Sequence, residues 1–190
     1  MVRNSCCASY KQEYVDDKTW FNWKKWGNYK TKAYVSIKDI DAITASGASD
    51  VHLVNIIESP KIRIKLTGAS DLKGDISAGT IIYHISGASD CKSSVAANTI
   101  AITGDGASKI ELAGRVDDLS VVISGASDAK LFNLNAKGAI LKASGASSIQ
   151  ATVTELLKAN SSGASSIDYK GNPNVKESNT FGASNIRHKN

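Results

Sequence analysis

The chain has 190 residues, a net charge of +5 and 42% hydrophobic residues, which is enough for one domain with a sizeable core. No apolar run approaches the length of a transmembrane helix, and only 6% of the residues are aromatic. Small and β-branched residues dominate, so the composition favours strands over helices. The basic excess is largest in residues 1–40, which hold eight basic and four acidic side chains. This pattern is typical of a solvated surface, and it also suits phosphate, anionic lipid or an acidic polysaccharide.

We interpret residues 1–30 as an N-terminal segment with an aromatic cap. All three tryptophans, Trp20, Trp23 and Trp26, lie in this segment, interleaved with lysines. The large rings would cover the open end of a repeat fold, whose unpaired strand edges need a cap. Alternatively, the tryptophan rings form a platform on which carbohydrate stacks. Single-stranded nucleic acid also suits lysines between aromatic residues, but we expect no nucleic-acid partner.

Residues 31–190 carry a repeat marked by the tripeptide Gly-Ala-Ser. Eight copies occur at spacings of about 19 residues, and the residue after the motif is often Asp. Their glycines are Gly47, Gly68, Gly87, Gly106, Gly125, Gly145, Gly163 and Gly182. Self-similarity at such a fixed period indicates a repeat architecture in which each unit stacks on its neighbours.

The apolar residues of the repeat follow a period of two. Residues four positions before the glycine are apolar, as in Ile64, Tyr83 and Ile102, and so are most residues four positions after it. Alternation of this kind is the strand period. Because the same pattern recurs in one direction, it predicts an all-β, single-stranded parallel β-helix of about eight coils. The signature of a leucine-rich repeat is missing, and helical repeats are longer.

The recurring tripeptide is interpreted as the corner of each coil. Glycine adopts positive φ without steric cost, and small Ala and Ser side chains allow close stacking. The serine hydroxyls would bond to neighbouring coils or to corner backbone groups. A flat ladder that binds a ligand is the functional alternative. Further corners are predicted at Ser59-Pro60-Lys61, Ala78-Gly79-Thr80, Ala97-Asn98-Thr99 and Ala136-Lys137-Gly138.

Few residues suggest chemistry. Asp50, Asp71 and Asp90 would stack on consecutive coils, where carboxylates either form a solvated edge, which we favour, or recruit Ca²⁺. The three histidines occupy different repeat positions, and Cys-x-x-Cys spacing is absent. Cys91 stands where other repeats have Leu72 or Ile110, so we expect it to be a small buried hydrophobe. We therefore expect no catalytic residue, metal or cofactor.

The repeats resemble a known family. Copies of Ser-Gly-Ala-Ser-Asp, the segment Ile167-Asp168-Tyr169-Lys170-Gly171-Asn172-Pro173 and the final Gly182-Ala183-Ser184 are similar to the family named putative auto-transporter adhesin, head GIN domain. The resemblance covers roughly residues 30–190. It implies a right-handed β-helix, a Bacteroidetes-type protein, and a place in the cell envelope, periplasm or extracellular space. The family defines no catalytic residues to carry over.

Three functions follow from these patterns. We favour a non-catalytic envelope or surface protein that acts as an adhesin or binding scaffold, with a glycan or a surface protein as partner. The second is a polysaccharide-binding or polysaccharide-degrading β-helix, and the third is ice binding through the small-residue ladder. Residues 1–12 lack the apolar stretch of a signal peptide. Membrane association is expected only through a lipid anchor that this chain does not contain, and the patterns predict no oligomeric state.

Overall fold

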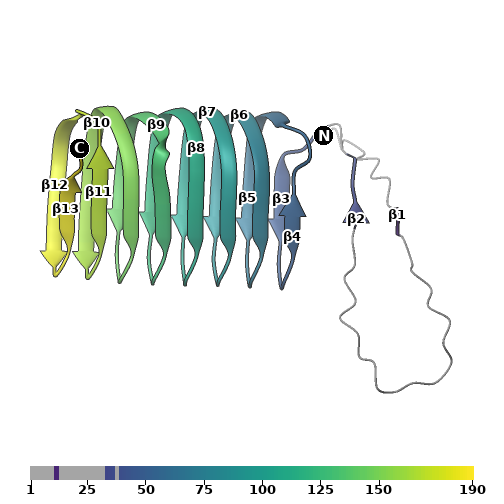
Figure 1. The fold of residues 1–190 in the computed structure, drawn as a ribbon, viewed down its shortest axis with the longest axis horizontal. Coiled ribbons are helices and arrows are strands. Elements are labelled where there is room, and N and C mark those ends of the chain that lie inside the picture. Colours follow the sequence, from purple (N-terminus) through teal and green to yellow (C-terminus); the bar gives the residue numbers. More distant parts are fainter. Residues whose placement is uncertain (1–10, 13–32, 37–38) are drawn as a thin grey trace, which may run out of the picture. The chain divides into compact units, whose positions relative to one another are not determined.

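The computed structural model describes residues 11–12, 33–36 and 39–190 (Figure 1). The chain divides into two compact units, residues 1–39 and 40–190. In the first unit, β1 (Lys11–Gln12) pairs antiparallel with β2 (Ala33–Tyr34). The second unit contains all eight Gly-Ala-Ser motifs and forms the solenoid.

The strands of the second unit pair in parallel, each with the equivalent strand of the next coil. The sheet order is β13-β11-β10-β9-β8-β7-β6-β5-β3, while β12 pairs with β10 and β4 with β6. The predicted all-β parallel solenoid of about eight coils is therefore confirmed. The strands are β3 (Ala42–Ala45), β4 (Asp50–His52), β5 (Ile57–Leu66), β6 (Asp71–Ile85), β7 (Asp90–Gly104), β8 (Lys109–Ile123), β9 (Asp128–Ala143), β10 (Ser148–Gly163), β11 (Ser166–Lys170), β12 (Asn174–Gly182) and β13 (Asn185–His188).

The core consists of rows of apolar side chains that stack from coil to coil. Leu72 pairs in register with Cys91, and Cys91 with Ile110; all three are buried. Cys91 is thus a small core residue, as its repeat position predicted. Tyr83 lies in a second such row and is fully buried. The period-two spacing read from the sequence therefore places the interior correctly.

The Gly-Ala-Ser motifs lie at the bends between successive strands. Their glycines all have positive φ, between +73° and +81°. At the six bends from Ala69 to Ala164, the alanine N–H donates to the motif glycine carbonyl of the preceding coil at 2.6–2.8 Å. The serine side chain turns inward: Ser89 is fully buried, and its hydroxyl donates to the Ser86 carbonyl at 3.0 Å. As expected, the hydroxyls satisfy backbone groups that the strands leave unpaired at the bend.

The additional corners expected around Gly79, Asn98 and Lys137 do not interrupt the strands. β6, β7 and β9 run through these positions, and Figure 1 shows that the ribbons curve without a break. Pairing between β6 and β7 omits Gly79 and Asn98. Two residues that are not buried lie between the buried side chains of Ala78 and Ile81. In a regular strand only one residue would lie between two successive buried side chains. The extra residue bends the coil while the inter-coil hydrogen bonds continue on both sides. We call this position the second bend.

Candidate binding surfaces

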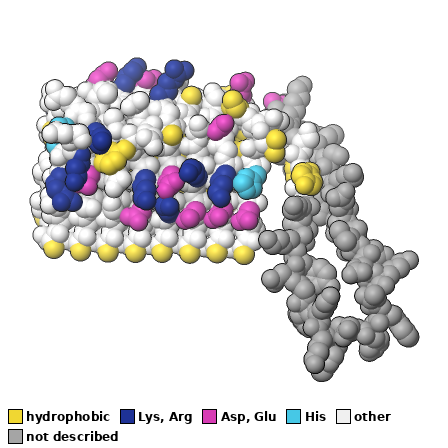
Figure 2. Space-filling view, viewed as in Figure 1, with side chains coloured by type: hydrophobic (Ala, Val, Ile, Leu, Met, Phe, Trp, Pro, Cys, Tyr) yellow, Lys and Arg dark blue, Asp and Glu magenta, His cyan; other side chains and the backbone are white. Residues whose placement is uncertain are grey.

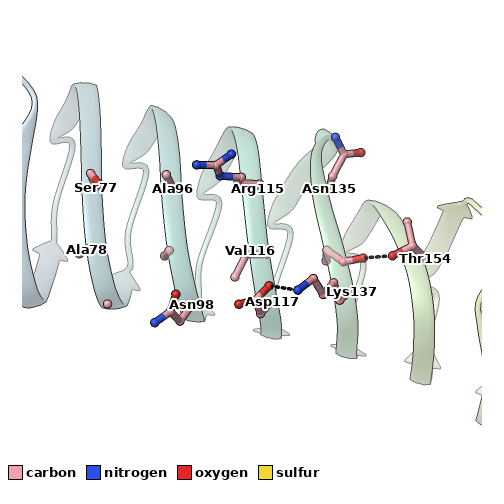
Figure 3. A pocket seen from close by; sticks show the side chains of 13 residues that line it. Ser77, Ala78, Ala96, Asn98, Arg115, Val116, Asp117, Asn135, Lys137 and Thr154 are labelled. Carbon is pink, nitrogen blue, oxygen red and sulfur yellow. Dashed lines mark hydrogen bonds and ion pairs between the residues drawn. The ribbon is translucent and has the colours of Figure 1, made fainter.

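A groove of about 640 Å³ crosses the coils at the second bend (Figure 3). Each coil contributes two residues to its lining, one just before the second bend and one at the bend. These two positions recur in β6, β7, β8 and β9, and Thr154 of β10 lies at one end of the groove. The first column comprises Ser77, Ala96, Arg115 and Asn135, and the second comprises Gly79, Asn98, Asp117 and Lys137. Because strand side chains alternate, these residues face outward while Ala78, Val116 and Ala136 turn toward the core. The groove is therefore an open feature of one solenoid face.

The polar groups of the groove differ in how far they are already paired. Lys137 Nζ lies 2.7 Å from Asp117 Oδ1, and this hydrogen bond raises the pKa of the lysine. Arg115 has no ion pair or hydrogen bond among the residues that the structure describes, and Figure 3 shows its guanidinium extending from β8 toward β7. The side-chain amides of Asn98 and Asn135 likewise make no hydrogen bond within that part of the chain. The groove thus offers a free guanidinium and two free amides to a ligand.

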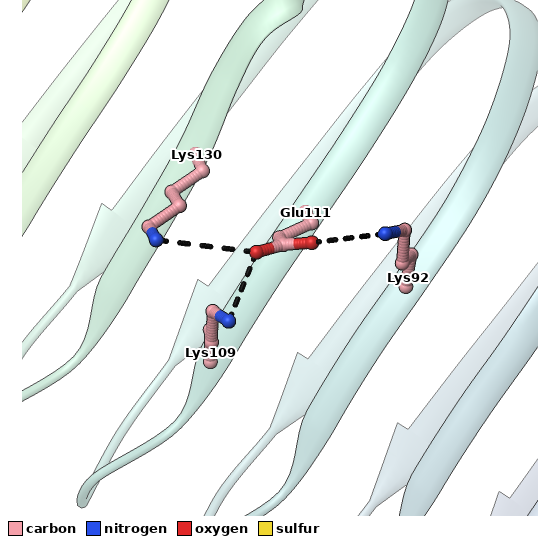
Figure 4. A network of polar contacts seen from close by, with 4 residues as sticks. All are labelled: Lys92, Lys109, Glu111 and Lys130. Carbon is pink, nitrogen blue, oxygen red and sulfur yellow. Dashed lines mark ion pairs between the residues drawn. The ribbon is translucent and has the colours of Figure 1, made fainter.

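A second candidate surface carries three of the six ion pairs among the described residues. Figure 2 shows basic and acidic side chains side by side along one face of the solenoid. Glu111 of β8 lies between three lysines: Lys109 Nζ at 2.9 Å, Lys92 Nζ at 3.5 Å and Lys130 Nζ at 4.0 Å (Figure 4). The hydrogen bond from Lys109 lowers the pKa of Glu111 and raises that of Lys109. We call these four residues the lysine–glutamate cluster. Glu111 compensates one of the three lysine charges, so the four residues keep a net charge of +2. Because the lysines are exposed, these ion pairs contribute little to stability.

The aspartates singled out in the sequence lie beside this cluster. Asp50 pairs in register with Asp71, and Asp71 with Asp90, so the three do stack on consecutive coils. The next position is Lys109, which interrupts the row. Within the described ranges, no three His, Cys, Asp or Glu side chains form a group that could hold a metal ion. Recruitment of Ca²⁺ by this row of aspartates stays a prediction.

A third surface, on the strand segments after the second bend, is partly apolar. Val122, Ile140 and Leu156 are each roughly 40% exposed, and Phe181 is 68% exposed. A shallow hollow of about 370 Å³ lies between Val122, Lys142 and Phe181. These residues are separated by polar ones such as Lys142 and Asn160, so the apolar area is discontinuous.

The isolated reactive side chains do not converge. His84 is exposed on β6, while His188 Nε2 lies 2.7 Å from the Gly171 carbonyl at the far end of the solenoid. Burial raises the pKa of the Cys91 thiol to about 12 and that of Tyr83 well above its ordinary value. Both groups are closed off from solvent and stay protonated at neutral pH. Among the residues described, no helix is long and apolar enough to cross a bilayer.

The predicted site residues have different outcomes. Trp20, Trp23 and Trp26 lie outside the described residues, so the aromatic platform stays a prediction. The groove was not predicted, although its signal was visible: Arg115, Asn98 and Asn135 stand at outward positions where the coil of β6 has the small residues Ser77 and Gly79. Sequence reasoning treated that bend only as a corner and did not compare its outward side chains between coils.

These features define a class: a parallel β-solenoid repeat protein whose candidate sites lie on open outer faces. Within that class the assignment is specific. Residues 14–173 match the family described as putative auto-transporter adhesin, head GIN domain, and the chain belongs to this family. The match covers most of the chain and confirms the resemblance carried by the Gly-Ala-Ser repeats.

Solved structures share the fold. A crystal structure of a putative adhesin from Parabacteroides merdae is 18% identical, with a TM-score of 0.76, and is matched over 79% of this chain and 64% of its own length. A putative adhesin from Parabacteroides distasonis is 20% identical, with a TM-score of 0.78 over 84% of this chain and 68% of that one. A putative adhesin from Bacteroides fragilis is 21% identical, with a TM-score of 0.61 over 95% and 76%. No curated protein matches the chain.

Proposed function

We propose that this chain is a non-catalytic binding module of the cell envelope or cell surface, which attaches to a partner through the outer faces of its solenoid. The observation that supports this most strongly is the groove at the second bend. It is open along its length, and three of its lining side chains, Arg115, Asn98 and Asn135, have no hydrogen-bond partner among the described residues, which suits a long ligand lying across several coils. Membership of an adhesin-named family agrees with this role and with an envelope location.

The main alternative is an enzyme that degrades polysaccharide. Glycoside hydrolysis ordinarily needs two carboxyl groups that flank the scissile bond. The groove lining contains one carboxylate, Asp117, and Lys137 holds it in an ion pair at 2.7 Å. The groove therefore supports binding better than cleavage.

The test measures binding and turnover on the same samples. The full chain is added to immobilised envelope and host-surface polysaccharides and to surface proteins, and bound protein is quantified by an antibody. The chain length and reducing ends of each polysaccharide are measured after prolonged incubation. We expect saturable binding to at least one surface without shortening of any chain. Depolymerisation, or no binding to any surface, would contradict the proposal.

The tryptophans are tested on the same panel. If they form a second stacking platform, Trp20→Ala, Trp23→Ala and Trp26→Ala together weaken glycan binding while the solenoid keeps its thermal stability. Unchanged binding by this triple variant would remove the aromatic cap from the binding function. Fractionation of cells that express the native gene tests the envelope location: the protein should appear with envelope or surface fractions, and recovery in the cytoplasm would contradict it.

A further inference from the structure

We propose that the groove at the second bend binds a polysaccharide that carries carboxylates, and that Arg115 holds a carboxylate of the sugar chain. This inference rests on the proposed binding function and names its ligand class. It starts from the charges of the groove lining: Arg115 and Lys137 are cationic, Asp117 is anionic, and the pairing of Lys137 with Asp117 leaves Arg115 as the lining charge without an ion-pair partner among the described residues. Asp118 and Glu155 act on Lys137 from outside the lining. A planar guanidinium binds carboxylate through two parallel hydrogen bonds.

The space beside Arg115 supports this assignment. In register with it on the two preceding coils are Ala96 and Ser77, the shortest side chains of that column. The short side chains there leave space over β6 and β7, and Figure 3 shows the Arg115 guanidinium reaching toward Ala96. A long side chain at either position would fill the hollow. The geometry thus places a cation at the edge of a shallow trough instead of on a flat surface.

The remaining lining groups suit sugar hydroxyls. Asn98 and Asn135 each present an amide that both donates and accepts hydrogen bonds, and Asp117 adds acceptor oxygens. Parallel strands lie about 4.8 Å apart, which is close to the length of one pyranose unit in an extended chain. Successive sugars would therefore meet equivalent positions on successive coils.

An acidic peptide fits the groove less well. Extended peptides usually bind by adding a strand to a sheet edge, where they use free backbone groups. At the groove, the flanking residues of β6, β7 and β8 already pair with the strands on both sides. The lining also lacks aromatic and large apolar side chains that would anchor peptide side chains. Recognition there would depend on side-chain hydrogen bonds, which is the chemistry that a polyhydroxyl ligand supplies.

The other cationic cluster is a weaker candidate for the same ligand. Lys92, Lys109 and Lys130 all lie within 4.0 Å of a Glu111 carboxylate oxygen. Asp90 and Asp128 flank Lys109 on the neighbouring coils. With Glu111, Asp90 and Asp128 beside the three lysines, the surface is formally neutral, so an incoming carboxylate would meet three anions as well as three cations. Arg115 has no such competitor within ion-pair distance among the described residues.

The experiment titrates the full chain with oligomers of polygalacturonate, alginate and hyaluronate by calorimetry. Methyl-esterified polygalacturonate is the matched control, since it keeps the hydroxyls and loses the charge. Arg115→Gln should weaken binding of the acidic oligomer about 10- to 100-fold, the usual effect of losing hydrogen bonds to a charged group. Lys73→Gln removes the same charge from an exposed position outside the groove and should change the affinity less than about twofold. Ala96→Gln, which fills the trough without changing charge, should also weaken binding.

The outcomes separate this inference from the proposed function. Binding that survives both Arg115→Gln and Ala96→Gln would overturn the groove and leave a binding module that uses another face. The same holds if none of the three acidic polysaccharides binds while the chain still attaches to a surface in the panel above. Equal binding of the esterified control would overturn the role of the carboxylate. If poly-glutamate binds more tightly than every acidic oligosaccharide and depends on Arg115, the ligand is a peptide and the saccharide assignment is wrong.

Discussion

The motif glycines stack closely from coil to coil, and alanine substitutions at Gly106 and at the terminal Gly47 test how much this stacking contributes to stability. Gly106 has φ +76°, and a Cβ added there would lie 2.7 Å from the Gly87 carbonyl oxygen and 3.1 Å from its nitrogen. Gly47 has nearly the same φ, +78°, but a Cβ added there meets nothing within 4 Å, because no motif glycine precedes it. Alanine at both positions therefore carries the same backbone strain, and only Gly106→Ala adds a clash with the neighbouring coil.

The magnitudes follow from these contacts. Positive φ costs an alanine about 1–2 kcal/mol, so Gly47→Ala should destabilise its corner by about that amount. In Gly106→Ala the coils must also separate locally, which adds about 1–3 kcal/mol for overpacking. That separation stretches the hydrogen bond from Ala107 N–H to the Gly87 carbonyl, now 2.8 Å. We expect Gly106→Ala to cost about 2–5 kcal/mol in total.

The assay is native-state hydrogen exchange combined with urea denaturation of the full chain. Exchange at Ala107 reports the corner next to Gly106, and exchange at Ala69, which donates to the Gly47 carbonyl at 2.6 Å, reports the terminal corner. Local measurement is needed because the first coil of a solenoid can fray without global unfolding. Equal local costs for Gly106→Ala and Gly47→Ala would refute the role assigned to close stacking.

Three further predictions concern the interior. Tyr83→Phe should raise the free energy of unfolding by about 1 kcal/mol, because the buried Tyr83 hydroxyl has no hydrogen-bond partner among the described residues; a clear loss of stability in urea would contradict this. Cys91 should react with a thiol reagent at pH 8 no faster than the protein unfolds, in a background where Cys6 and Cys7 are serine; rapid labelling of native protein would contradict its burial. Since folding raises the Cys91 pKa from 9.0 to about 12, the unfolded thiol ionises first, and stability should fall as pH rises above about 9. Ser89→Ala should cost about 1–2 kcal/mol, because the Ser86 carbonyl loses its donor, and thermal unfolding unchanged from the native chain would rule that out.

The sequence was sufficient to predict what repeats within each coil. Positions such as Leu72, Cys91 and Ile110 recur at a fixed distance from the glycine, so their shared row follows from periodicity alone. The bonding of the motif serine to corner backbone groups also follows, since a small hydroxyl can satisfy the corner carbonyl that remains unpaired. These predictions succeeded because they depend on local geometry that every coil reproduces.

The groove could not be predicted in the same way. Periodicity places Ala96 beside Arg115, since each lies nine residues after its motif glycine, Gly87 or Gly106. The groove depends instead on differences in side-chain size between coils, which a repeat pattern does not show. The second bend posed a related difficulty. Gly79 and Asn98 are typical turn residues, yet inter-coil pairing resumes at the next residue and keeps the strand continuous. Tertiary hydrogen bonding there outweighs the local turn preference.

Amide shift mapping tests the binding account most directly. The ¹⁵N-labelled full chain is titrated with an acidic oligosaccharide that binds in the calorimetric panel, and backbone and Arg115 side-chain signals are followed. The account predicts that the largest shifts occur at Ser77, Ala96, Arg115 and Asn135, and that they disappear in Arg115→Gln. Shifts concentrated at Lys92 and Lys130, or spread evenly over the solenoid, would contradict it.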